Sequence, residues 1–196
     1  GPALCVLRLG HNDLGSVEPA LLRPLVRLDE LDLSSAELNS LDPKTLASLG
    51  ALRSLDLSAN RLVSLVPGTF RALRSLETLR LSGNRLAALD LYAFVGLHNL
   101  RLLQLAHNLI GTVETHAFGG PSFGLSEHKL NLASQKIVEL GPFAFQGLAY
   151  VAVLDLSDNF ITLLRNNTFA GMYSLTHLLL AVNCIRELDA LAFDSS

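Results

Sequence analysis

Apolar residues recur along the chain in one frame, Leu-x-x-Leu-x-Leu-x-x-Asn-x-(Leu/Ile), which returns eight times in 196 residues. The frames begin at Leu4, Leu28, Leu52, Leu76, Leu100, Glu127, Val151 and Leu175. Six of the seven intervals between successive frames are 24 residues long and one is 27. A fixed period of this length predicts a stack of similar coils and not a globular domain with a scattered core.

Leucine occupies the fourth and sixth positions of every frame, from Leu7 and Leu9 in the first to Leu178 and Leu180 in the last. This period of two predicts one short strand in each coil, with the leucines on one face and the intervening residues on the other. Positions 11, 14 and 19 are also apolar in all eight frames. Each coil therefore contributes several apolar side chains to one continuous core.

Position 9 of the frame predicts a turn held by side-chain amides. It is asparagine in six frames, at Asn12, Asn60, Asn84, Asn108, Asn159 and Asn183. An asparagine amide both donates and accepts, so it satisfies backbone groups that the turn would otherwise bury unpaired. Gln135 keeps the amide on a longer stem, whereas Ala36 has none. We therefore expect a water molecule or a shifted backbone at Ala36.

Two further features predict the structure of the segments that return to the next strand. Four prolines share position 16, where they favour an extended or turn-like return over a long helix: Pro19, Pro43, Pro67 and Pro142. The 27-residue interval contains residues 119–126, which precede a frame that begins with Glu127 instead of leucine. Phe123 or Leu125 is expected to fill that gap in the core; a protruding contact loop is the alternative.

Together these positions resemble the leucine-rich repeats over essentially the whole chain. The 24-residue length and the x-Phe-x-x-Leu ending, as in Phe70 with Leu73, resemble the extracellular kind found in Toll-like receptors, Slit proteins and neuronal adhesion receptors. The resemblance implies an α/β fold: a right-handed solenoid with a concave parallel sheet of about eight strands and a convex side that is irregular or 3₁₀. Strand spacing predicts a shallow arc roughly 34 Å long.

The same resemblance bears on the domain organisation. Residues 1–196 are expected to form a single array of eight coils. Extracellular members of the family normally carry cysteine-rich caps at both ends, and neither is present here. The sequence is therefore interpreted as an excerpt from a longer solenoid.

Composition limits the possible functions. The chain is 49% hydrophobic with a mean hydropathy of +0.38, but it has no apolar run of the 18 or more residues that a membrane-spanning helix needs. Its net charge is −3, and neither half is basic enough to indicate nucleic-acid binding. No membrane segment and no nucleic-acid partner are therefore expected.

Cysteine usage and one glycosylation motif bear on the compartment. Cys5 and Cys184 lie in the first and last coils, about 34 Å apart, which is too far for a disulfide. Asn166 opens an Asn-x-Thr acceptor motif at position 16, where a glycan would not block the concave sheet. Asn166 therefore favours an extracellular or cell-surface parent, whereas two thiols that cannot pair with each other are compatible with an intracellular scaffold.

Partner recognition is expected on strand residues that face away from the core, because the sheet presents them as a rigid array. The predicted partner-binding residues are Arg8, Asp32, Asp56, Thr78, Arg80, Leu102, Gln104, Lys129, Asn131, Asp155 and Leu179. Position 7 is small throughout, which we attribute to crowding at the turn.

The charges on this face have two interpretations. Arginines on or beside it are interleaved with Asp32, Asp56 and Glu77: Arg53, Arg61, Arg80, Arg85 and Arg101. They form either a mixed-charge patch for an acidic protein partner or ladders of ion pairs between adjacent coils. The second interpretation is preferred, because one strand spacing would let Asp56 reach Arg80.

An apolar cluster is predicted on the same side of the last two coils, at Val153, Phe160, Leu179 and Val182. It marks either an interface or core exposed at the end of the array. Catalysis has no comparable support, because the six histidines fall at differing positions without metal-ligand spacing and no nucleophile elbow is present. No catalytic residue, metal or cofactor is predicted.

The sequence thus predicts a protein-binding module of a receptor or adhesion ectodomain, which recognises a protein ligand or co-receptor through the concave face or flank. A homodimer is possible. The alternatives are a structural or oligomerising solenoid segment and an intracellular scaffold.

Overall fold

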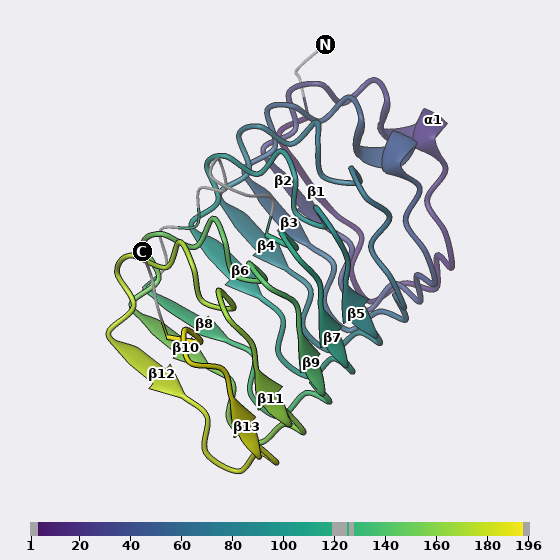
Figure 1. Cartoon of the computed structure of the whole chain (residues 1–196). Helices are drawn as coiled ribbons and strands as arrows, with labels where there is room; N and C mark the ends of the chain where they lie inside the picture. Colours follow the sequence, from purple (N-terminus) through teal and green to yellow (C-terminus); the bar gives the residue numbers. More distant parts are fainter. Residues whose placement is uncertain (1–3, 119–124, 126–127, 194–196) are drawn as a thin grey trace.

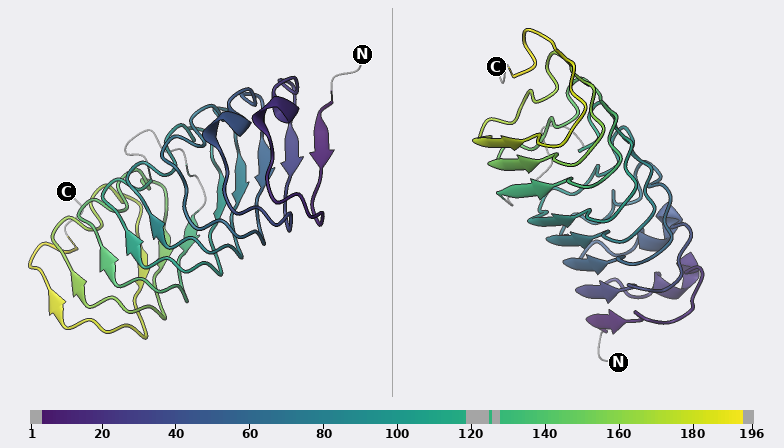
Figure 2. Two further views of the ribbon diagram at one scale, coloured as in Figure 1. Left: turned by 90° about the vertical axis from the view of Figure 1, so that its right-hand side faces the viewer. Right: turned by 90° about the horizontal axis from the view of Figure 1, so that it is seen from below.

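The computed structural model describes residues 4–118, 125 and 128–193. The coils follow one another in chain order from one end of a stack to the other, and each lies against the next (Figure 1). Seen from two further sides, the stack is open and its first and last coils are far apart (Figure 2). These views agree with the predicted arc of stacked coils.

A row of eight parallel strands runs along the concave side. The strands are β1 (Val6–Arg8), β2 (Glu30–Asp32), β3 (Ser54–Asp56), β4 (Thr78–Arg80), β6 (Leu102–Gln104), β8 (Lys129–Asn131), β10 (Val153–Asp155) and β12 (His177–Leu179). Paired strands align equivalent positions, so Leu55 lies opposite Leu79. The hydrogen-bonded ladder joins β1, β2, β3, β4 and β6 in one group and β8, β10 and β12 in another. The predicted parallel row is confirmed, with an interruption between β6 and β8.

A second row of two-residue strands follows the asparagine turns. It consists of β5 (Ala88–Leu89), β7 (Thr112–Val113), β9 (Glu139–Leu140), β11 (Leu163–Leu164) and β13 (Glu187–Leu188), as Figure 1 shows. Among the described residues, helical structure is confined to α1 (Pro19–Leu22) and to the 3₁₀ turn η1 (Pro43–Leu46). Both begin at a position-16 proline, which confirms a short return in place of a long helix.

The core is continuous along the stack. The leucines of positions 4 and 6 are fully or nearly fully buried in the central coils, as Leu55 and Leu57 illustrate. Position 19 supplies a row of stacked rings whose neighbouring centroids lie 5.5–6.3 Å apart: Phe70, Phe94, Phe118, Phe145, Phe169 and Phe193. Since each coil packs only on its neighbours, stability accumulates along the array.

The position-9 asparagines connect successive turns. Asn84 Oδ1 accepts the amide of Leu62 in the preceding coil at 3.1 Å. Its Nδ2 donates to the carbonyls of Leu57, also in the preceding coil, and Leu81, at 2.9 and 3.0 Å. Asn60, Asn108, Asn159 and Asn183 repeat this pattern. The predicted role of the amide is therefore confirmed.

At Ala36 the backbone replaces the missing side chain. The amides of Leu14 and Gly15 donate to the Ala36 carbonyl at 3.2 and 3.1 Å, and the Ala36 amide donates to Asn60 Oδ1 at 3.0 Å. Glu37 adopts φ of +60°, a left-handed conformation at the residue after position 9. Of the two alternatives expected at Ala36, the structure contains the shifted backbone.

The junction after the 27-residue interval is less regular. Leu125 is fully buried, as expected for a residue that fills the gap, whereas Phe123 lies outside the described residues. Gln135 Nε2 donates to the Leu105 carbonyl at 3.2 Å, but its buried Oε1 has no hydrogen-bond partner within the described part of the chain. This departure occurs in the coil where the concave ladder is interrupted.

Candidate functional site

All eleven predicted partner-binding residues lie on strands of the concave row. Arg8 is on β1, Asp32 on β2, Asp56 on β3, Thr78 and Arg80 on β4, Leu102 and Gln104 on β6, Lys129 and Asn131 on β8, Asp155 on β10, and Leu179 on β12. They flank the inward leucines, so their side chains leave the core side of the sheet. Their exposure ranges from half-buried Asp56 to exposed Gln104 and Lys129.

Four of these residues also stabilise the end of their own strand. The carboxylates of Asp32, Asp56 and Asp155 accept the amide of the serine two residues later, at 2.8, 2.9 and 3.1 Å. Asn131 Oδ1 accepts the amide of Ala133 in the same way, at 2.8 Å. The Asp-x-Ser spacing signals such a turn in the sequence, and the sequence interpretation missed it.

Ion pairs between adjacent coils are present, as the preferred interpretation of the charges predicted. Arg8 Nε lies 2.7 Å from Glu30 Oε1, and this hydrogen bond and the charge of Glu30 raise the pKa of Arg8 above its usual value. At position 2 of the frame, Arg53 contacts Asp29 and Glu77 at 3.2 and 3.5 Å. The arginines are well exposed and Glu30 and Glu77 are half-buried at the surface, so solvent screens each pair and its contribution to stability is small.

The predicted ion pair between Asp56 and Arg80 is wrong. The two residues are paired in register on β3 and β4, but Asp56 Oδ1 instead accepts the Ser58 amide and hydroxyl at 2.9 and 2.5 Å. Arg80 forms no ion pair with any residue that the structure describes. Its guanidinium is therefore available to a partner.

A hollow of about 400 Å³ opens on the concave face where the ladder is interrupted. Its lining includes Gln104 and His107 from the β6 coil and Lys129 and Asn131 from β8. Three of these were predicted as partner-binding residues, and the structure brings them together at one place. His107 was not predicted as a partner-binding residue, because nothing in the sequence around it indicated that the ladder is interrupted beside it.

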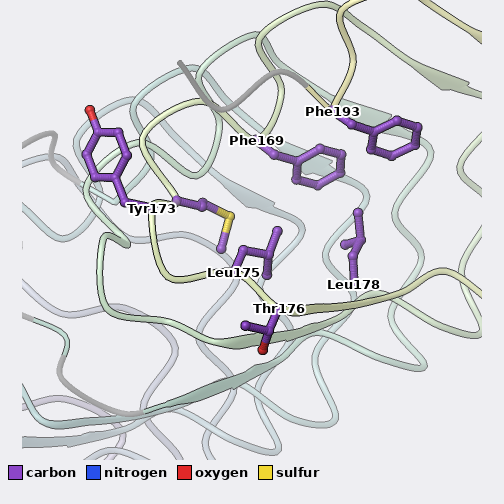
Figure 3. A pocket seen from close by; sticks show the side chains of 7 residues that line it. Phe169, Tyr173, Leu175, Thr176, Leu178 and Phe193 are labelled. Atoms are coloured by element: carbon purple, nitrogen blue, oxygen red, sulfur yellow. The ribbon is translucent and has the colours of Figure 1, made fainter.

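The last coil carries a second hollow, of about 200 Å³, beside core side chains (Figure 3). It is lined by Phe169, Met172, Tyr173, Leu175, Thr176, Leu178 and Phe193. The last coil packs on a neighbour on one side only, which leaves Leu178 half-buried and Phe193 57% exposed. This hollow is an exposed cross-section of the core and presents little recognition chemistry.

The predicted apolar cluster is exposed nearby. Phe160, Leu179 and Val182 are 55%, 40% and 75% exposed, whereas Val153 is half-buried. Exposed apolar groups of this kind are compatible with an interface.

Other chemistry is sparse in the described parts of the chain. Residues 4–118, 125 and 128–193 contain no group of three or more side chains arranged to hold a metal ion. No helix among them is long and apolar enough to cross a membrane. Cys5 and Cys184 are exposed in the first and last coils and are not bonded to each other.

Stacked coils with a concave parallel sheet, buried leucine rows and asparagine turns define a leucine-rich repeat solenoid. The chain belongs to the leucine rich repeat family, whose sequence model matches residues 27–86, 74–122 and 128–193. No curated protein sequence matches it.

Solved structures of the same fold include immune receptors and protein complexes. TLR13 in its complex with ssRNA13 matches 98% of this chain at 32% identity with a TM-score of 0.80. The Drosophila Toll–Spatzle complex matches 99% at 23% identity and 0.72, which shows the fold alone, and the LRIM1/APL1C complex matches 95% at 25% identity and 0.70. The chain spans 27%, 29% and 32% of those three chains.

Proposed function

We propose that this chain is a protein-binding module of a receptor or adhesion ectodomain, and that it takes a protein ligand or co-receptor on its concave face. The observation that carries the proposal is the array of outward side chains on eight parallel strands, which are held in register within the group β1, β2, β3, β4 and β6 and again within β8, β10 and β12. Such an array supplies many weak contacts at fixed spacing, which suits a broad protein surface better than a small molecule.

The likeness to receptor structures supports this proposal. Toll with Spatzle and LRIM1 with APL1C are both complexes between proteins. TLR13 was solved with single-stranded RNA, which makes RNA the competitor that an experiment has to exclude. The proposed location is the cell surface or the extracellular space, as part of a secreted or membrane-anchored parent.

Charge reversal of Arg80 tests the concave face. Arg80 has no ion pair in the described structure, so Arg80→Glu removes no salt bridge from the fold. For the parent protein and a ligand that it captures, we expect about tenfold weaker binding by surface plasmon resonance. The matched control is Arg186→Glu: Arg186 is exposed, precedes β13 in the second row, and likewise forms no ion pair with any described residue. If both variants weaken ligand binding equally, or if neither weakens it, the concave face is not the binding surface.

We also propose that Asn166 carries a glycan. Asn166 is exposed, and its Oδ1 accepts the Leu191 amide at 3.0 Å. Because Asn166 follows β11 in the second row, a glycan there leaves the concave strands open. A parent protein secreted by mammalian cells should lose mass on enzymatic removal of N-glycans from the peptide containing Asn166, and Asn166→Gln should abolish that loss. Unmodified Asn166 in the secreted parent would refute this proposal.

Self-association is the second candidate, favoured by the exposed side chains of Phe160, Leu179 and Val182. Sedimentation equilibrium of the parent over a wide concentration range distinguishes the two. A homodimer is supported if the molecular mass of the wild type rises with concentration while Phe160→Ser keeps the mass of a monomer. A constant monomer mass excludes self-association in that range.

A further inference from the structure

The concave face and the turns that follow its strands change their charge at the middle of the stack. Positions 3 to 10 of the β4, β6 and β8 coils, residues 78–85, 102–109 and 129–136, contain no aspartate or glutamate. They contain four basic residues: Arg80, Arg85, Lys129 and Lys136. The same positions of the coils on either side carry acidic residues, among them Asp32, Asp56 and Asp155. The result is a basic band across three coils.

Most of this positive charge is not neutralised by the residues that the structure describes. Arg80, Arg85 and Lys136 form no ion pair with any described residue. Lys129 Nζ lies 3.8 Å from Asp155 Oδ2, a long contact to a carboxylate whose other oxygen already accepts from Ser157. An anionic group placed at the band would therefore meet cations that have little competition from the fold.

The hollow between β6 and β8 lies inside this band and is lined by hydrogen-bond donors. At other junctions, such as β3 to β4, the amide of position 8 donates to the next coil, as Ala59 does to Ser82 at 2.8 Å. At the interruption, the equivalent His107 amide has no such partner among the described residues of the β8 coil. His107 is exposed and belongs to the lining of the hollow.

Side chains add further donors at the same hollow. Asn131 Oδ1 is occupied by the Ala133 amide, so the Nδ2 group remains to donate outward. Gln104 and Lys129 are exposed beside it. Donors from a backbone amide, two carboxamides and an ammonium thus converge on a hollow of about 400 Å³. This combination suits a carboxylate, which only accepts hydrogen bonds.

We propose that the hollow between β6 and β8 is the anchor point for an acidic segment of the protein partner, with an aspartate or glutamate side chain of that segment inserted at His107, Lys129 and Asn131. The proposal rests on the proposed function of the concave face and gives it a chemical specificity. The excess of basic residues around the hollow is the charge complementarity that selects this partner.

A glutamate-rich peptide tests the site directly. Its affinity for the parent protein is measured by fluorescence anisotropy at low and physiological salt, beside a glutamine version of the peptide and a single-stranded RNA of equal charge. We expect the glutamate peptide to bind more tightly than both. Lys129→Gln and Gln104→Glu should each weaken it about fivefold or more, because each changes one charge at the hollow.

Matched controls separate the hollow from overall charge. Arg165→Gln removes one positive charge beside β11, and Asn39→Asp adds one negative charge at an exposed position of the β2 coil. Both should leave the peptide affinity within about twofold of wild type. Equal losses in all four variants would show that binding follows net charge only. Tighter binding of RNA through the same residues would overturn the assignment to a protein segment.

The outcome is distinguishable from failure of the proposed function. If the captured protein partner loses affinity with Arg80→Glu but is unaffected by Lys129→Gln and Gln104→Glu, the concave face binds and the hollow is not the anchor. If neither set of substitutions changes partner affinity, the concave-face function itself fails. Far-UV circular dichroism of each variant confirms that the fold is retained.

Discussion

Replacing Asn84 by alanine removes one amide from the asparagine row and leaves a defined defect. The carbonyls of Leu57 and Leu81 each lose one donor but keep another, from Asn60 and Asn108 respectively, both at 3.0 Å. Only the amide of Leu62 loses its sole recorded acceptor. The substitution therefore creates one buried unpaired N–H and removes two shared hydrogen bonds.

The expected cost follows from these losses. An unpaired buried N–H costs about 1–3 kcal/mol, and each shared bond contributes about 0.5 kcal/mol or more. The backbone could rearrange as it does at Ala36, but Arg85 would then adopt a left-handed conformation, which costs a non-glycine residue about 1–2 kcal/mol. We expect Asn84→Ala to lower the free energy of unfolding by about 2–4 kcal/mol, measured by urea denaturation with circular dichroism.

Asn12 provides the matched control. It is exposed, and among the described residues its Nδ2 donates only to the carbonyls of Leu9 and Gly10 in its own coil. Asn12→Ala should therefore cost about 1 kcal/mol or less. Equal losses in Asn12→Ala and Asn84→Ala would refute the reasoning, because they would show that the links between coils add nothing.

Three further substitutions probe other parts of the fold. Phe94→Ala should lower the free energy of unfolding by about 3–5 kcal/mol in the same assay, because it removes a fully buried ring from the stack. Tyr173→Ala is the control: this residue is 76% exposed, and its replacement should change the free energy of unfolding by less than about 0.5 kcal/mol. Gly96→Ala should lower the free energy of unfolding by about 3 kcal/mol, and Gly15→Ala by about 1 kcal/mol. Both glycines have a positive φ, but only the new methyl group at position 96 would meet backbone, 2.6 Å from the Cα of Arg71. Similar losses in the two variants would contradict this steric account. Arg53→Gln should cost about 1 kcal/mol or less and the difference should vanish in 1 M salt, so a larger or salt-independent loss would argue against a screened surface pair.

The repeat pattern was enough to predict the strands, the buried leucine rows and the asparagine turn. It was enough because each position has the same neighbours in every coil, so local and tertiary preferences agree. Ala36 illustrates this point: one missing amide in the frame predicted a local backbone shift. The left-handed conformation at position 8 was not predicted. Glycine, the residue that usually signals a positive φ, occupies position 8 only at Gly83, whereas residues such as His107 and Val182 adopt a positive φ there without such a signal.

The site was predicted less completely than the fold. Strand alternation placed all eleven residues on the concave row, but it gave no information on which neighbour each side chain would choose. Asp56 was expected to reach Arg80 and instead binds Ser58, because a contact two residues away is made without ordering a long side chain. The three additional residues of the long interval were visible in the sequence, but the interruption between β6 and β8 was not, because strand pairing depends on coil spacing, which the repeat pattern does not specify.

Hydrogen–deuterium exchange of the parent protein, with and without its protein ligand, tests the central claim most directly. If the concave face binds, peptides covering β4, β6 and β8 and their following turns should exchange more slowly in the complex. They include the His107 amide, which has no partner among the described residues of the next coil. Protection confined to the second row, around β9 and β11, with no change in the concave strands, would contradict the account.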